Sequence, residues 1–337
     1  MIKTDIIIIG AGPVGLFAVF EAGLMKLRCH LIDAIPFPGG QLSEIYPKKP
    51  IYDIPGFPIV LAGELVDNLM EQAKPFKPGF TLGEQAESIS KQEEGSFIVT
   101  TSEGTRHTAP IIFIAGGLGS FGPRKPKIYN LEKYENKGIY YFVKEPSFYQ
   151  EKKVFISGGG DSALDWVIYF AERTGKSVGL VHRSEFFRAH KDSVDKIYDL
   201  RDKRKIDLYT NSEVIALSGD DSLNSITIKN NDGNLINESL DCWLPLFGLS
   251  PKLGPIANWN LNIEKNAIEV DNTLDYQTNV PGIYAIGDIN TYSGKLKLIL
   301  CGFHEATLAV QSAYKKIYAN KKVVLKYTTV KGVQGFD

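Results

Sequence analysis

The chain is poor in cysteine, in net charge and in long apolar segments, and each deficit excludes a class of protein. Only three cysteines occur among 337 residues, Cys29, Cys242 and Cys301, and no two of them form a C-x-x-C pair. A disulfide framework is therefore excluded, and we expect the reducing environment of the cytoplasm. The formal net charge of −1 gives no support for bulk binding to nucleic acid or to a membrane.

The longest apolar stretch, residues 6–20, is too short to span a membrane and contains three glycines and a proline. Asp5 stands where a secretion signal would be basic. We interpret this stretch as a strand, a turn and a helix. Short basic clusters at 124–127, at 203–205 and at Lys295 with Lys297 are interpreted as solvated faces rather than docking sites.

The first strand-turn-helix pattern carries a dinucleotide fingerprint. Residues 5–10 (DIIIIG) predict a strand buried on both faces of a parallel sheet, and Gly10-Ala-Gly12-Pro13-Val-Gly15 follows. Gly10 permits the tight turn, Gly12 lets the backbone approach a pyrophosphate, and Gly15 lets the helix pack closely on the strand. Pro13 suits the first helical turn, whose free N–H groups face the phosphates.

A second predicted strand, 29–32, ends at Asp33, which is placed to accept a hydrogen bond from a ribose hydroxyl. The strand, glycines, helix, second strand and terminal acid together predict a dinucleotide site. A glycine-rich turn without a ligand is the alternative.

The same pattern recurs in the middle of the chain. A strand at 154–157 precedes GGGDSA (158–163), and a helix-like stretch follows at 164–172. Alanine in place of the third glycine is an accepted variant of the fingerprint. The residues expected to contact this second dinucleotide are Gly158, Gly160, Asp161, Ser162 and Ala163.

The strand after this second turn, 177–181, ends in His182 and Arg183 instead of an acid, and Arg188 follows closely. An acid would repel a ribose 2′-phosphate, whereas arginine can pair with it through two hydrogen bonds. We therefore predict FAD in the first site and NADPH in the second, with all three of these residues at the NADPH ribose. Ordinary surface arginines are the alternative for Arg183 and Arg188.

Two such units predict an α/β fold with two dinucleotide-binding (Rossmann-like) domains. We expect a discontinuous FAD-binding domain, residues 1–115 and 248–337, with an NADPH-binding domain, 116–247, inserted into it. The glycine-rich segments at both boundaries are interpreted either as hinges or as plain turns. In the last part, a strand at 283–287 ends at Asp288, where an acid beside a glycine can bind a ribityl chain or is simply part of a turn.

Several motifs, spread over nearly the whole chain, are typical of one protein family. They are GAGPVG (10–15), GGQLSEIYP (39–47), YDIPG (52–56), GGGDSALDW (158–166), FGLSPKLGPI (247–256), IYAIGDI (283–289) and GFHEA (302–306). On these motifs the chain resembles the ferredoxin–NADP reductases of the thioredoxin-reductase-like type, which are homodimeric bacterial FAD enzymes.

This resemblance implies a set of cofactor contacts. Asp33 would bind the FAD ribose, Gln41 would lie near the flavin, and Tyr46 would stack on one face of the isoalloxazine. The remaining implied contacts are Ala86 with the adenine, Phe121 with the flavin region, Asp288 with the ribityl chain, Thr329 with the flavin ring, and Tyr327, from the partner subunit, with the opposite ring face. Core packing is the alternative for Tyr46 and Phe121, because aromatic residues fill cores more often than they bind cofactors.

The related thioredoxin reductases carry a redox C-x-x-C shortly before the second glycine motif, where this chain has GIYYFVKEPSF (138–148). Without a dithiol relay, electrons must leave the flavin directly. We therefore expect a one-electron carrier, ferredoxin or flavodoxin, as the partner. Hydride transfer to FAD needs no general acid or base, so no catalytic side chain and no metal ligand is predicted. The alternatives are an NADPH-dependent reductase of a quinone or a disulfide protein, and a sensor without turnover.

Overall fold

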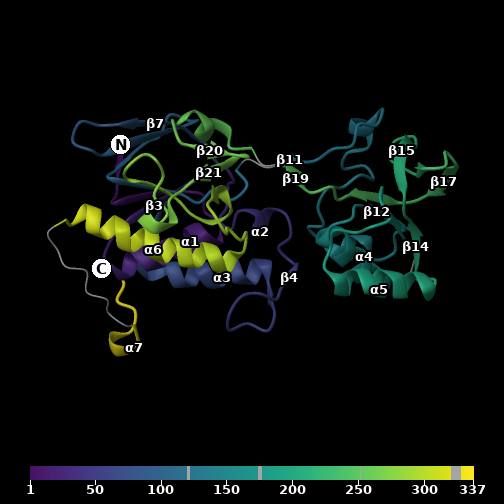
Figure 1. Ribbon diagram of the computed structural model, residues 1–337, viewed down its shortest axis with the longest axis horizontal. Helices are drawn as coiled ribbons and strands as arrows, with labels where there is room; N and C mark the ends of the chain where they lie inside the picture. The colour runs from purple at the N-terminus through teal and green to yellow at the C-terminus, as the bar shows by residue number, and fades with distance from the viewer. Residues whose placement is uncertain (120–121, 174–176, 251, 320–327) are drawn as a thin grey trace. The chain divides into compact units, whose positions relative to one another are not determined.

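The computed structural model describes residues 1–119, 122–173, 177–250, 252–319 and 328–337. The chain divides into two compact units (Figure 1). Unit 1 comprises Met1–Phe121 and Pro251–Asp337, and unit 2 comprises Gly122–Ser250. This division rests on compactness alone, so the boundaries after residues 115 and 247 stay predictions for the cofactor-binding domains.

Unit 1 is built around a parallel sheet of five strands. In spatial order these are β22 (Ile283–Ala285), β10 (Ile111–Ile114), β2 (Ile6–Ile9), β3 (Cys29–Asp33) and β6 (Gly79–Leu82). β2 and β10 read IIII and IIFI, and all eight residues are buried. Such uninterrupted apolar strands require cover on both faces of the sheet.

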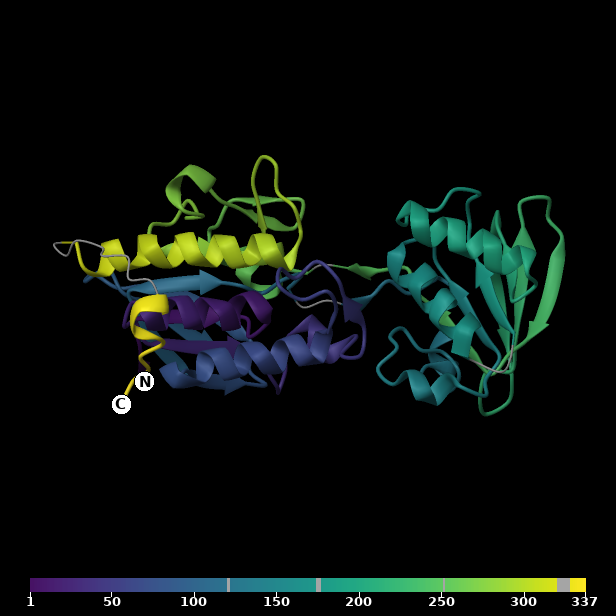
Figure 2. The same cartoon turned by 90° about the horizontal axis from the view of Figure 1, so that it is seen from below.

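Helices cover one face of this sheet and an antiparallel sheet covers the other. α1 (Pro13–Leu24), α3 (Ala62–Ala73) and α6 (Ile299–Ile317) pack on the first face through Ile6, Ile8 and neighbouring core residues (Figure 2). The alternate residues, Ile7 and Ile9, face a second core with β8 (Phe97–Thr101) and β9 (Arg106–Ala109). The antiparallel sheet has the order β1 (Ile2–Lys3), β9, β8 and β7 (Ala86–Lys91), although β1 joins β9 in parallel.

The remaining elements of unit 1 are short. They are α2 (Gln41–Glu44), β4 (Pro50–Ile51), β5 (Val60–Leu61), η1 (Lys74–Phe76), η4 (Gly254–Asn258), β20 (Ile263–Glu264), β21 (Ala267–Glu269), η5 (Asn272–Leu274), η6 (Gly287–Ile289), β23 (Asn290–Thr291) and α7 (Thr328–Lys331).

Unit 2 repeats the plan with a four-stranded parallel sheet. Its order is β14 (Ile206–Tyr209), β13 (Val178–Val181), β12 (Val154–Ser157) and β18 (Cys242–Pro245). α4 (Asp161–Arg173) and α5 (Lys191–Asp202) share one core with this sheet. The other core includes β16 (Ser225–Asn230), which lies between β15 (Ser212–Ser218) and β17 (Leu235–Ser239). The prediction of two Rossmann-like units is confirmed.

The chain enters and leaves unit 2 through two short paired segments. β11 (Gly122–Pro123) pairs antiparallel with β19 (Leu249–Ser250), and the 3-10 turns η2 (Leu131–Tyr134) and η3 (Pro146–Tyr149) follow β11. Among the described residues, no helix combines the length and the apolar character that a membrane crossing requires.

Unit 1 contains two buried histidines that share one hydroxyl. The Nε2 atoms of His30 and His107 lie 2.8 and 2.9 Å from the Oγ1 of Thr81. His30 is 8% exposed and His107 is fully buried. Burial, followed by the neighbouring His107, lowers the pKa of His30 from 6.5 to about 4, and burial also lowers the pKa of His107. Both rings are therefore neutral in the folded protein at neutral pH.

We expect the free energy of unfolding to fall as the pH drops from about 6.5 to about 4. Over this interval the unfolded chain binds a proton on His30 and the folded chain does not. This difference in proton binding lowers the free energy of unfolding by about 3 kcal/mol. Replacement by His30→Asn should remove this part of the pH dependence in urea unfolding followed by circular dichroism. His304→Asn, at an exposed histidine of α6, is the control. An unchanged pH profile in His30→Asn would contradict the prediction.

Candidate functional site

The three glycines at the start of α1 have different roles in the structure. Gly10 has φ +109°, and an added Cβ would lie 2.4 Å from the carbonyl oxygen of Ala115. A Cβ on Gly15 would lie 2.1 Å from the carbonyl oxygen of Gly10. At Gly12, the N-cap residue, no atom of the described chain apart from its two chain neighbours lies within 4 Å of the Cβ position. Gly10 and Gly15 are thus required by the fold, whereas Gly12 keeps open the space before the helix N-terminus.

Asp33 is fixed beside this open space. Its Oδ2 accepts a hydrogen bond from the backbone N–H of Ala11 at 2.7 Å, and its Oδ1 accepts one from Ile35 at 2.9 Å. Burial raises the pKa of the Asp33 carboxyl, and these two hydrogen bonds oppose the rise. Each oxygen retains acceptor capacity, so the ionised carboxylate can also bind a ribose hydroxyl. The backbone N–H of Glu84 bonds to the carbonyl of Asp33, and Ala86 begins β7 two residues later.

The C-terminal part of unit 1 meets the same end of α1. Cβ atoms built on Gly287 and Gly302 would lie 3.3 and 2.4 Å from the Cγ2 of Val14, so η6 and the first turns of α6 lie against the start of α1. Asp288 follows Gly287 and is half-buried. Burial raises the pKa of Asp288, while Lys295 and Lys297 oppose the rise.

The segment around α2 completes this arrangement. A Cβ on Gly40 would lie 3.2 Å from the Cα of Gly12, and one on Gly117 would lie 3.1 Å from the Nε2 of Gln41. Tyr46 is half-buried, and burial followed by the charge of Asp288 raises its pKa. The structure thus gathers Asp33, Gln41, Tyr46 and Asp288 around the N-terminus of α1.

Three of the predicted flavin contacts are not part of this group. Phe121 and Tyr327 lie outside the described residues. Thr329 is exposed in α7, which lies away from α2 in both views (Figures 1 and 2). The chain beyond it is held near the other end of α1, where Phe336 donates its N–H to Pro75 and Lys26 donates to the carbonyl of Gln334. The structure therefore does not bring Thr329 to Asp288 of the same chain, and its flavin contact stays a prediction.

The glycine turn of unit 2 has a similar design. A Cβ on Gly158 would lie 2.8 Å from the Cβ of Ala163, so Ala163 packs where the third glycine of the fingerprint would. Gly160, like Gly12, has no described atom within 4 Å of its Cβ position. Asp161 and Ser162 are exposed at the first turn of α4. The second helix N-terminus therefore also faces open space.

The segment after β13 folds over this turn. The backbone N–H of Arg188 donates to the carbonyl of Gly159 at 2.7 Å, and that of His190 donates to the Oδ1 of Asp161 at 2.8 Å. The side chains of Arg183 and Arg188 are exposed. These contacts bring the segment that carries the two arginines to the same end of the sheet as Gly160 and leave their side chains exposed.

His182 occupies a different place from the two arginines. Its side chain is buried, and a Cβ on Gly159 would lie 2.0 Å from its ring. The ring stacks on Phe187 with centroids 4.8 Å apart, and its Nε2 lies 3.2 Å from the carbonyl of Phe186. Burial lowers the pKa of His182, so the ring is neutral. The buried ring of His182 packs against Gly159 and so supports the glycine turn. Direct contact between His182 and a nucleotide stays a prediction.

One interpretation of the sequence is wrong. Lys297 is exposed as expected of a solvated face, but only 6% of the Lys295 side chain is exposed, and its Nζ forms an ion pair with the fully buried carboxylate of Glu305. Glu305 was not among the predicted site residues. Its signal in the sequence was a charged residue on the otherwise apolar side of a helix, four residues before Ala309 and five before Val310 of the core.

The cysteines do not form a thiol centre. Cys29 and Cys242 are buried in different units, and Cys301 is half-buried in α6. Burial raises the pKa of Cys29 and raises that of Cys242 to about 11, so both stay protonated at neutral pH.

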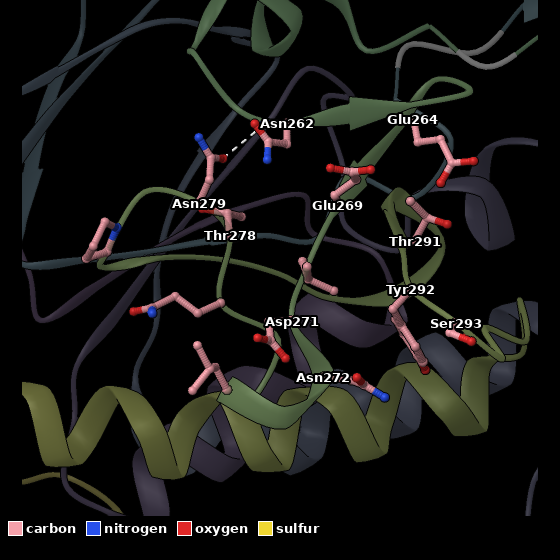
Figure 3. A pocket seen from close by; sticks show the side chains of 14 residues that line it. Asn262, Glu264, Glu269, Asp271, Asn272, Thr278, Asn279, Thr291, Tyr292 and Ser293 are labelled. Atoms are coloured by element: carbon pink, nitrogen blue, oxygen red, sulfur yellow. Dashed lines mark hydrogen bonds between the residues drawn. The ribbon is translucent and has the colours of Figure 1, made fainter.

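An open cavity of about 960 Å³ lies elsewhere in unit 1 (Figure 3). Acidic and amide side chains line it, among them Asn262, Glu264, Glu269, Asp271 and Asn279. The carboxylate of Asp271 already caps η5 by accepting the N–H of Thr273 at 2.8 Å. None of the predicted cofactor residues lines this cavity, so it is separate from the two glycine turns.

Comparison with known proteins gives a consistent result. The family model of the pyridine nucleotide-disulphide oxidoreductases matches residues 4–313. The chain is 66% identical to ferredoxin–NADP reductase 1 of Christiangramia forsetii over 340 residues, which cover 100% of this chain and 96% of that protein. It is 64% identical to the ferredoxin–NADP reductase of Flavobacterium johnsoniae, with the same coverage. The crystal structure of Lactococcus lactis thioredoxin reductase superimposes with a TM-score of 0.78 at 25% identity, covering 94% of this chain and 100% of that one.

The chain therefore belongs to the pyridine nucleotide-disulphide oxidoreductase family, and within it to the ferredoxin–NADP reductases with the thioredoxin-reductase fold.

Proposed function

We propose that the protein is a ferredoxin–NADP(+) reductase that binds FAD in unit 1 and NADP(H) in unit 2 and exchanges electrons with ferredoxin or flavodoxin. The observation that carries this proposal is the pair of open helix N-termini with opposite charge beside them. Gly12 has the carboxylate of Asp33 as its neighbour, and Gly160 has the exposed Arg183 and Arg188. A carboxylate selects an unmodified ribose, whereas guanidinium groups select a 2′-phosphate.

The residues of unit 1 fit FAD from end to end. Ala86 lies at the end where Glu84 bonds to Asp33, and it would contact the adenine. The first N–H groups of α1 would take the pyrophosphate, with Gly12 leaving it room. Asp288 would bind the ribityl chain, and Gln41 and Tyr46 would lie at the flavin. This order follows the contacts of the described chain.

When bound, FAD supplies the exchange between a two-electron hydride and a one-electron carrier. The chain contributes binding and orientation. Tyr46 would exclude water from one side of the site, while Asp33 and Asp288 would hold the cofactor at two points along its length. In unit 2, Gly160 would admit the pyrophosphate of NADP(H), and Arg183 with Arg188 would hold the 2′-phosphate. We assign no proton transfer to a side chain, since hydride transfer needs none.

Direct transfer to a carrier protein is supported by the state of the thiols. Reduction of a disulfide substrate through a dithiol relay in the enzyme would require two of its thiols to lie close enough in space to form a disulfide. Cys29 and Cys242 are buried in separate units with raised pKa values. A one-electron acceptor that approaches the flavin itself needs no such relay.

We propose further that the protein is a cytoplasmic homodimer. The resemblance to homodimeric enzymes and the low cysteine content support this. Exposed apolar side chains between β4 and β5 also favour contact with another chain, since Tyr52 is 68% and Ile59 is 53% exposed. Light scattering after gel filtration measures the mass directly, and a monomer would contradict the proposed dimer.

The function is tested by the visible spectrum of the purified protein before and after anaerobic addition of NADPH. We expect a yellow protein whose flavin absorbance at about 450 nm bleaches within seconds, followed by faster turnover with ferredoxin than with thioredoxin. A colourless protein that takes up no FAD would remove the proposal. A flavoprotein that prefers thioredoxin would instead replace the carrier by a disulfide protein.

A further inference from the structure

A buried ion pair holds the turn that carries Asp288. The Oε2 of Glu305 accepts the backbone N–H of Gly287 at 2.7 Å and the Nδ2 of Asn290 at 2.8 Å. Its Oε1 accepts the hydroxyl of Tyr292 at 3.0 Å and the ammonium of Lys295. The carboxylate thus receives four hydrogen bonds, which fills its acceptor capacity.

Lys295 binds the other backbone group of Gly287, its carbonyl oxygen. Its Nζ donates to the carbonyl oxygen of Gly287 at 2.9 Å as well as to Glu305. The N–H and the C=O of one residue are therefore both held by the same ion pair. Because Gly287 has φ +78°, which other residues rarely adopt, the turn needs such fixed partners. Asp288 is the next residue, so its direction depends on this clamp.

Packing alone does not explain these charges. The Glu305 side chain is fully buried and that of Lys295 is 6% exposed, and the removal of two charges from water opposes folding unless every hydrogen bond is made. An apolar residue would suit the buried side of α6 with less cost in solvation. The pair lies where η6, α1 and α6 meet through Gly287, Val14 and Gly302. Its position is therefore at the proposed FAD site and not in a remote part of the core.

We propose that Lys295 and Glu305 are positioning residues for FAD, which act by clamping both backbone groups of Gly287 so that Asp288 is preorganised for the cofactor. This inference rests on the proposed function of unit 1. It predicts that the loss of either charge weakens FAD binding, because the turn at Gly287 no longer holds Asp288 in place. The nucleotide site of unit 2 should be unaffected.

The test is the dissociation constant of FAD for the apoprotein, measured by quenching of flavin fluorescence, in Lys295→Met and Glu305→Gln. We expect an increase of about tenfold or more in each variant, because each loses charge-assisted hydrogen bonds to the turn. Lys297→Met, at the exposed lysine two residues further, is the matched control and should change the constant less than about twofold. Adenosine 2′,5′-bisphosphate, as the probe of unit 2, should bind all variants equally.

A double variant, Lys295→Met with Glu305→Gln, separates positioning from stability. It leaves no buried charge without a partner, so the thermal midpoint of the apoprotein should return towards that of the wild type even where a single variant folds poorly. FAD affinity should stay low in the double variant, because the carbonyl of Gly287 still lacks its ammonium donor. Recovery of wild-type FAD affinity in the double variant would overturn the proposal, as would folded single variants that bind FAD as tightly as the wild type.

The same titration distinguishes this inference from the proposed function. A wild-type apoprotein that binds no FAD would remove the function of unit 1. A wild type that binds FAD together with unaffected variants would remove only the role of Lys295 and Glu305.

Discussion

Gly12→Val is expected to give a folded protein that retains less than about a tenth of the wild-type FAD. Gly12 has φ −73° and ψ −178°, which any residue adopts, and no described atom lies within 4 Å of its Cβ position. The substitution therefore costs the apoprotein little. The valine would instead fill the space through which the pyrophosphate approaches the N–H groups of α1. Flavin content after purification and the thermal midpoint of the apoprotein measure the two effects separately.

Gly10→Ala is the contrasting variant. Its φ of +109° and the close carbonyl oxygen of Ala115 make a side chain incompatible with the strand and turn themselves. We expect this variant to lower the thermal midpoint of the apoprotein, which Gly12→Val should leave nearly unchanged. If Gly12→Val kept its full FAD content, the N-terminus of α1 would not be the pyrophosphate site.

Local pattern was sufficient to predict both nucleotide-binding units. In each case a short apolar strand, a glycine turn and an apolar helix follow one another directly, so that neighbouring residues determine the motif. The fingerprint also indicated that the glycines have different tasks, and the structure agrees: Gly10 and Gly15 are needed by backbone contacts within the protein, whereas Gly12 and Gly160 are adjacent to open space. The contact between Gly10 and Ala115 joins residues that are remote in sequence, so the fingerprint alone does not reveal that partner.

The parts that sequence reasoning missed depend on contacts between distant segments. Lys295 stands in an alternating KLKL run that is typical of a solvated edge, and only the position of Glu305 on α6 explains its burial. In the same way, Gly302 of α6 packs against Val14 and Gly287, which lie far from it or in another element of the chain. His182 was grouped with Arg183 by adjacency. Both residues follow the end of β13, but the ring of His182 is buried against Gly159 and Phe187 while Arg183 is exposed.

Arg183→Ala is expected to lower kcat/KM for NADPH by about tenfold to a hundredfold and to change kcat/KM for NADH less than about threefold. The reason is that a guanidinium forms charge-assisted hydrogen bonds with the 2′-phosphate and has no such partner on NADH. Arg188→Ala should act in the same direction, because its backbone bond to Gly159 survives the substitution and only the side chain is lost.

Steady-state reduction of ferricyanide, an artificial acceptor, measures both nucleotides without a carrier protein. Arg173→Ala, an exposed arginine at the other end of α4 from Gly160, is the matched control and should leave the preference unchanged. Higher ionic strength should also reduce the preference of the wild type for NADPH, since both arginines are exposed to solvent ions. An equal loss with both nucleotides in Arg183→Ala would show that the residue maintains the fold of the loop. The charge at the end of β13 would then not select the cofactor.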